Sequence, residues 1–60
     1  MVKIKARQED AYWVYEIRHG EQKWISDKFD TLKECLDASL YFCNLKGFRI
    51  DAIDVHGEDG

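Results

Sequence analysis

The first stretch of the chain alternates strictly between apolar and basic residues. Residues 2–7 read V-K-I-K-A-R, which places Val2, Ile4 and Ala6 on one side of an extended backbone and the basic side chains on the other. A period of two is typical of a strand that is buried on one face and solvated on the other. We therefore predict a half-buried strand here.

Two further strands are predicted from residue type. Residues 11–18 and 21–26 are rich in aromatic and β-branched side chains, which suit a pleated surface. Polar residues 8–10 separate the first two strands and predict a turn. His19 and Gly20 predict the next turn, because glycine tolerates a positive φ.

Residues 32–46 predict an amphipathic helix. Thr31 and Glu34 have the spacing of a capping box, in which a hydroxyl and a carboxylate satisfy amide groups of the first turn. Gly47 predicts a left-handed C-cap, with Phe48 folding back as the apolar contact of that motif. The stripe expected to face the core consists of Leu32, Cys35, Leu36, Ser39, Leu40, Phe42 and Cys43.

A last strand is predicted over residues 48–56. Its apolar positions change parity between Ile50 and Ile53, and a bulge near Asp51 and Ala52 would restore the alternation. The element order is therefore β-β-β-α-β. We predict an α+β fold with a three- to four-stranded, mainly antiparallel sheet and one helix packed on one face.

The length of 60 residues limits the chain to one domain, which we place at residues 1–56, followed by a flexible acidic tail at residues 57–60. A domain of this size buries only about 60% of the surface that its unfolded chain exposes. The core is therefore expected to be thin, and there is no room for a cleft between domains.

The hydropathy of the chain and the spacing of its two cysteines both favour a cytoplasmic protein. No long apolar segment follows the first eight residues, and a membrane span needs about 20 apolar residues. Cys35 and Cys43 lie on one helix, about 12 Å apart along its axis, whereas a disulfide needs Cα atoms within roughly 7 Å. We expect two reduced core thiols in a cytoplasmic protein; a redox or metal site, the alternative, would lack any CxxC pair or nearby histidine.

Catalytic motifs are not apparent. His19 and His56 are expected at a turn and at a strand end, both in solvent. The sequence has no glycine-rich phosphate loop, no GxSxG or HExxH motif, and no paired zinc-ligand spacing. We predict a protein that is not an enzyme and that needs no metal or cofactor.

Charge argues against nucleic acid and membranes as the default partners, because the formal net charge is −3. Weak nucleic-acid binding through Lys3, Lys5 and Arg7 stays open as an alternative. Asp51 and Asp54 have two interpretations. With the acidic tail they form a strip that meets a basic groove of a partner, or they pair across strands with the two lysines.

Aromatic residues indicate a protein-binding surface. A single helix covers one face of a sheet, so Tyr12 and Val14 of the second strand are expected on the open face. Tyr41 lies in the middle of the polar arc of the helix, and Leu45 lies on the same flank. Exposed aromatic side chains are typical of interfaces. Isolated exposed apolar residues, or a second copy of the chain covering the open face, are the alternatives.

Residues 29–53 (FDTLKECLDASLYFCNLKGFRIDAI) resemble the family of small early proteins with which T-seven-like phages inhibit host RNA polymerase. That family combines a few strands with a helix opened by T-L-x-E-x-L and a Gly-Phe before the last strand. The family is known for arginines on this last strand, where the present chain has Ala52 and Asp54, so only the general mode carries over. The matching positions are Thr31, Leu32, Glu34, Leu36, Gly47 and Phe48.

The same segment is similar to HicB-type antitoxins, whose strands and D-T-L-x-E-A helix form a comparable core. Both resemblances imply a small protein that binds and blocks a larger one. We therefore predict a non-catalytic, phage- or prophage-type modulator of a host protein, with a HicB-like antitoxin or a homodimeric structural protein as alternatives. The predicted partner-binding residues are Tyr12, Val14, Tyr41, Asp51 and Asp54.

Overall fold

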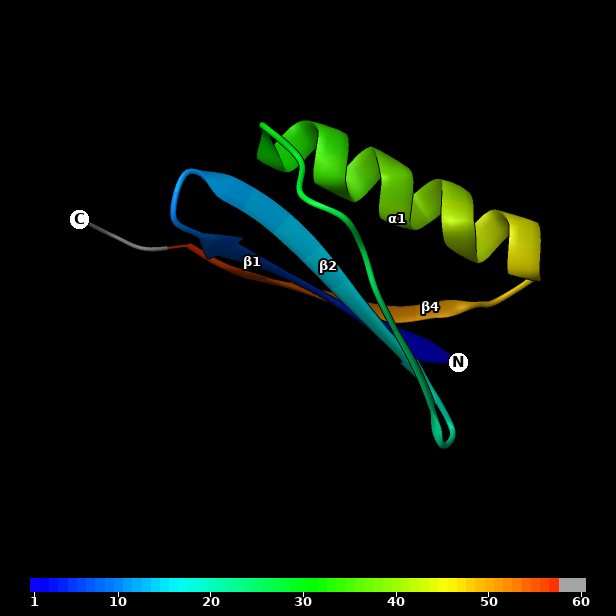
Figure 1. Ribbon diagram of the computed structural model, residues 1–60. Coiled ribbons are helices and arrows are strands. Elements are labelled where there is room, and N and C mark those ends of the chain that lie inside the picture. The colour runs from blue at the N-terminus through cyan, green and yellow to red at the C-terminus, as the bar shows by residue number, and fades with distance from the viewer. Residues whose placement is uncertain (58–60) are drawn as a thin grey trace.

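The computed structural model describes residues 1–57 and has the predicted β-β-β-α-β order (Figure 1). Strands β1 (Val2–Glu9), β2 (Tyr12–His19) and β3 (Gln22–Ile25) precede helix α1 (Leu32–Lys46), and strand β4 (Ile50–His56) follows it. The α+β class, with one helix packed on one face of the sheet, is confirmed. Residues 58–60 of the predicted acidic tail lie outside the described residues.

The sheet has the strand order β3-β2-β1-β4. Strands β1 and β2 are antiparallel, as are β2 and β3, whereas β4 runs parallel to β1. The predicted mainly antiparallel sheet is therefore a four-stranded mixed sheet. The reason is the helical connection: α1 carries the chain back across the sheet, so that the next strand starts at the same end as β1.

The strand bounds differ from the predicted ones: β1 is two residues longer, β2 is shifted by one residue, and β3 is shorter by one residue at each end. Gln8 belongs to β1, and the first turn is formed by Asp10 and Ala11, with Asp10 at φ 58°. The second turn consists of Gly20 and Glu21, with Gly20 at φ 63°. Both turns are two residues long, and each begins at a residue that tolerates a positive φ, Asp10 in the first turn and Gly20 in the second.

The core lies between α1 and the central strands. The side chains of β1 alternate between buried and exposed along its first half, as the period of two predicted. On the helix side of this layer lie the three buried residues of α1, which are spaced four residues apart: Cys35, Ser39 and Cys43. The most completely buried side chains are Val2, Ile4, Ala6, Ile17, Cys35, Ser39 and Cys43.

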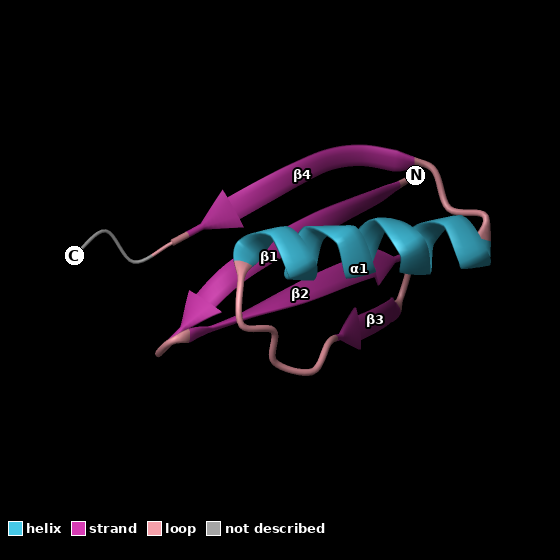
Figure 2. Cartoon of the chain, turned by 90° about the horizontal axis from the view of Figure 1, so that it is seen from above, coloured by secondary structure: helices cyan, strands magenta, loops and turns pink. Residues whose placement is uncertain are grey.

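An aromatic cluster fills the space between α1 and the β2–β3 side of the sheet. The ring of Trp24 lies 5.5 Å from those of Phe42 and Phe48, and Tyr15 stacks on Phe29 at 6.2 Å. These large rings bind the helix to this side. As a consequence α1 packs mainly on β1 and β2, and β4 lies to one side of it (Figure 2).

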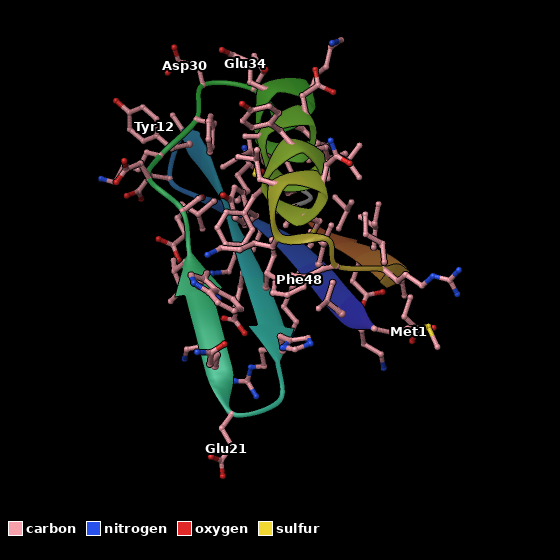
Figure 3. All side chains as sticks on the ribbon, turned by 90° about the vertical axis from the view of Figure 1, so that its right-hand side faces the viewer. Met1, Tyr12, Glu21, Asp30, Glu34 and Phe48 are labelled. Carbon is pink, nitrogen blue, oxygen red and sulfur yellow. The ribbon has the colours of Figure 1, made fainter. Side chains whose placement is uncertain are left out.

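Both ends of α1 lie where the sequence predicted, but the capping box is only half formed, because the Glu34 carboxylate is bonded to the Thr31 hydroxyl and not to a backbone amide. The Thr31 hydroxyl accepts a hydrogen bond from the Glu34 N–H at 3.1 Å, and the same hydroxyl donates to the Glu34 carboxylate. Gly47 is left-handed at φ 72°, and the Phe48 N–H donates to the Cys43 carbonyl at 2.9 Å. The Phe48 ring packs between the helix end and the sheet (Figure 3), where it also stacks on a histidine ring.

Strand β4 contains the predicted bulge. Val2 lies opposite Ile50, but Lys3 lies opposite Ala52, so Asp51 is the extra residue. The strand itself begins two residues later than predicted. The bulge keeps the apolar residues on both sides of it on the same face of the sheet.

Candidate protein-interaction surfaces

The open face of the sheet, opposite α1, is charged. Glu16 is almost buried there, although no second layer covers this face. Its carboxylate accepts hydrogen bonds from Arg18 at 3.0 Å and from Arg7 at 3.4 Å. The long arginine side chains therefore cover the carboxylate and exclude water from it.

The basic residues around Glu16 control its ionisation. Burial alone would disfavour the charged form. The hydrogen bond from Arg18 and the positive charges of Arg18, Lys23 and Lys5 outweigh that effect and hold the pKa of Glu16 below its ordinary value. Glu16 is thus a negative centre that is hydrogen-bonded to arginines of β1 and β2 and attracts the positive charge of Lys23 in β3.

The acidic residues of β4 lie beside lysines on this same face. Asp54 is opposite Lys5 in the sheet register, and Asp51 projects from the bulge next to Lys3 and Lys5. Together with neighbouring side chains they line a shallow pocket of about 510 Å³. Asp51 and Asp54 therefore lie beside the two lysines, as the cross-strand interpretation predicts, while the acidic tail residues that would complete a strip lie outside the described residues.

The two residues predicted at the centre of the open-face surface differ in accessibility. Tyr12 is exposed and points away from α1 (Figure 3), with the ammonium of Lys28 5.3 Å from its ring. Val14 lies on the open face as expected but is only 6% exposed. The expectation that Val14 is accessible is wrong, because its neighbours on this charged face cover it. An apolar surface around both residues is therefore not formed.

The outer side of α1 carries two exposed apolar side chains. Tyr41 is 65% exposed and Leu45 is 66% exposed, and they are four residues apart on the helix. Residues at this spacing lie next to each other on a helix surface. Here the sequence prediction of exposure is confirmed, and the two side chains form what we call the helix ridge.

A second apolar surface lies where α1 meets β4. Ile50, Ile53 and Val55 are on the helix side of the sheet, but they are between 36% and 46% exposed because α1 is displaced towards β3. Leu40, predicted in the buried stripe, is similarly exposed; it projects from the flank of α1 opposite Phe42, which faces β3. We call these four residues the β4 patch.

Sequence reasoning missed the β4 patch, although the geometry of its elements contains a signal. A helix with its side chains is about 10 Å wide, and neighbouring strands are about 4.8 Å apart, so one helix covers about two strands. A four-stranded sheet under one helix must therefore leave apolar side chains uncovered at one edge. Which edge is uncovered depends on the tertiary packing.

Nucleophilic and metal-binding side chains do not gather at a site within residues 1–57. Cys35 and Cys43 are buried free thiols, and burial raises the pKa of both. His19 and His56 are exposed, and the ring of His19 stacks on Phe48 at 4.4 Å. No group of three or more His, Cys, Asp or Glu side chains in this part of the chain is arranged to hold a metal ion. Nor is any helix described there long and apolar enough to cross a bilayer.

Comparison with protein families, with curated proteins and with solved structures finds no match for this chain. The resemblances to phage polymerase inhibitors and to HicB-type antitoxins therefore stay predictions from the residues that carry them.

Proposed function

We propose that this chain is a small non-catalytic protein-binding module, which acts by occupying a surface of a larger protein as phage- or prophage-type modulators of host proteins do. The observation that carries the proposal is the position of its exposed apolar side chains. Six of the nine large ones in the described residues lie in the second half of α1 and in β4. They form two separate surfaces, the helix ridge and the β4 patch, and exposed apolar surfaces of this kind are typical of interaction sites.

The contact with the partner is proposed at the helix ridge. Tyr41 and Leu45 project from the outer side of α1, where the fold does not require an apolar residue. An amphipathic helix that presents a tyrosine and a leucine one turn apart fits an apolar groove on another protein. Tyr12 of the open face is a weaker candidate, since charged groups surround it.

Affinity capture from a bacterial lysate tests this function. The wild type is compared with the double variant Tyr41→Ala/Leu45→Ala, with Tyr12→Ala, and with Lys33→Ala as an exposed helix control. We expect one specific protein to bind the wild type and both single variants, and binding to fall by about 30-fold or more in the double variant, as for central interface residues. Circular dichroism checks that each variant is folded.

Two results would contradict parts of the proposal. If the wild type captures no specific protein, the proposed function is wrong. If the double variant captures the same protein as strongly as the wild type, the module binds a partner but does so through a different surface.

Nucleic-acid binding is a second candidate function, favoured by one observation. The sheet brings Arg18 and Lys23 onto the same face as Lys3, Lys5 and Arg7, so five basic side chains share the open face. Glu16, Asp51 and Asp54 lie among them and the net charge is −3, which weakens the attraction. Retention on DNA or RNA that decreases with salt, and that Lys3→Ala/Lys5→Ala abolishes, would support this alternative.

A further inference from the structure

We propose that β4 is a self-association edge, through which two copies of this chain pair antiparallel to form one continuous eight-stranded sheet. The inference is independent of the helix ridge and of the partner proposed for it. It rests on three features of β4: an unpaired outer edge, an uncovered apolar side, and a residue sequence that is complementary to itself about a twofold axis.

The outer edge of β4 is open. The strand is seven residues long and, in the described part of the chain, pairs only with β1. Natural proteins protect such edges with charged side chains, above all lysine, with proline, with β-bulges or with very short strands. Strand β3 at the opposite edge is four residues long and contains Lys23, whereas β4 is seven residues long and has two aspartates and one bulge but no lysine. The two edges of the sheet are therefore protected to different degrees.

The apolar side of β4 fits a second copy when the antiparallel register is centred on Ile53. Ile53 then lies opposite Ile53 of the second copy. The bulge counts Asp51 and Ala52 as one position, so Ile50 lies opposite Val55 and Val55 opposite Ile50. All three apolar side chains of each strand thus meet apolar partners, and the Leu40 side chain of each α1 borders the resulting cluster.

Charge on the open face supports the same register. Asp54 of one copy lies opposite Ala52 of the other, and Ala52 is followed in the sheet by Lys3. The small alanine leaves space for the lysine to reach the carboxylate of the second copy, and symmetry repeats this pair. A register centred on Asp54 would place two carboxylates opposite each other, and one centred on Ala52 would pair a shorter part of the strand.

The test uses charge at the twofold axis. In solution, the wild type is expected to have twice the 7.1 kDa mass of one chain. Ile53→Lys and Ile53→Asp each place like charges opposite each other, so each variant alone is expected to be a monomer, with self-association weakened by about 30-fold or more. An equal mixture of the two variants is expected to recover the dimer, because opposite charges then meet.

The matched control is Ile25→Lys, which puts the same charge on an exposed isoleucine of β3 and is expected to stay dimeric. A wild type of single-chain mass at millimolar concentration overturns the proposal. So does a dimer that survives both Ile53 substitutions, or a mixture of the two variants that stays monomeric.

Isotope-filtered NMR keeps the proposal testable if an Ile53 variant fails to fold. In a dimer of labelled and unlabelled wild-type chains, the Ile53 methyl groups of the two copies are expected to show a mutual NOE. Its absence from a dimeric sample contradicts the register. Failure of the partner capture described above would leave this result unaffected, because Tyr41 and Leu45 take no part in it.

Discussion

At the scale of single residues, Glu16 is the most informative side chain. It lies at the centre of the open face, accepts hydrogen bonds from Arg7 and Arg18, and is nearly inaccessible to water. A carboxylate that is paired in this way favours its charged form in the folded state. Removing the Glu16 carboxylate would take away a negative charge that offsets the mutual repulsion of the basic side chains on the open face.

Glu16 gives a pH-dependent prediction. Its pKa is lower in the folded state than in the unfolded state, so its contribution to stability is complete above the unfolded value and is lost as the pH falls through the folded value. Urea unfolding of Glu16→Gln is therefore expected to show a deficit in unfolding free energy at pH 7 that narrows at acidic pH, below about 4. The exposed Glu21→Gln is the control for the loss of one carboxylate charge. A Glu16→Gln deficit that is constant from pH 7 to pH 3 would refute this role.

Residue-level patterns predicted much of the local structure and the accessibility of β1 and of the outer side of α1, but not the accessibility of Val14 and Leu40. Thr31, Glu34 and Gly47 act through groups within a few residues of themselves, so the sequence alone was sufficient for the helix ends. The exposure of Val14 and Leu40 depends on which side chains of other elements cover them. The surface predicted around Tyr12 and Val14 was misplaced for that reason.

At the scale of elements, the local shape of α1 and β4 follows from their own sequences, whereas the position of α1 on the sheet does not. The boundaries of α1 follow from its caps, and the bulge in β4 follows from the change in parity of its apolar residues. The position of α1 above the sheet follows from neither. It depends on the tertiary contacts that the rings of β2 and β3 make with Phe42 and Phe48, and on Phe29 before the helix, which stacks on the ring of β2. The β4 patch is a consequence of that packing.

The end of α1 provides a test of local backbone conformation. Gly47 has φ 72°, and a Cβ atom added there would meet nothing within 4 Å. Gly47→Ala is therefore expected to lower the free energy of unfolding by about 1 kcal/mol through backbone strain alone, and Gly47→Asn by less, because asparagine tolerates this conformation better. Chemical denaturation measures both. Equal stability of the alanine variant and the wild type would show that the cap is not strained.

At the scale of the whole molecule, the two sides of the sheet and its two edges have different properties. The open face is charged and internally compensated, the helix ridge faces away from the sheet, and the β4 patch lies along one edge. A chain of 60 residues with a thin core gains stability from any association that extends its apolar interior. Self-association along β4 would therefore contribute to the stability of the fold itself.

Thermal unfolding tests this link between assembly and stability. If only the dimer has the paired β4 edge, the wild-type Tm is expected to rise by about 5 °C for each tenfold increase in protein concentration. Ile53→Lys is expected to lose this dependence, and Ile25→Lys to retain it. Calorimetry over a hundredfold range of concentration is sufficient, and a wild-type Tm that does not change with concentration would count against a stabilising dimer.

The pairing of β1 with β4 also has a consequence for biosynthesis. Strand β1 is central in the sheet and is translated before the other strands, yet Val2 reaches its neighbour Ile50 only after β2, β3 and α1 have been made. The first three strands can form a meander on the ribosome and α1 can cover their apolar face, but the second edge of β1 stays unpaired until β4 emerges. For this chain, completion of the sheet therefore waits for the translation of β4, and until then the nascent intermediate has an unpaired strand edge that chaperones can recognise.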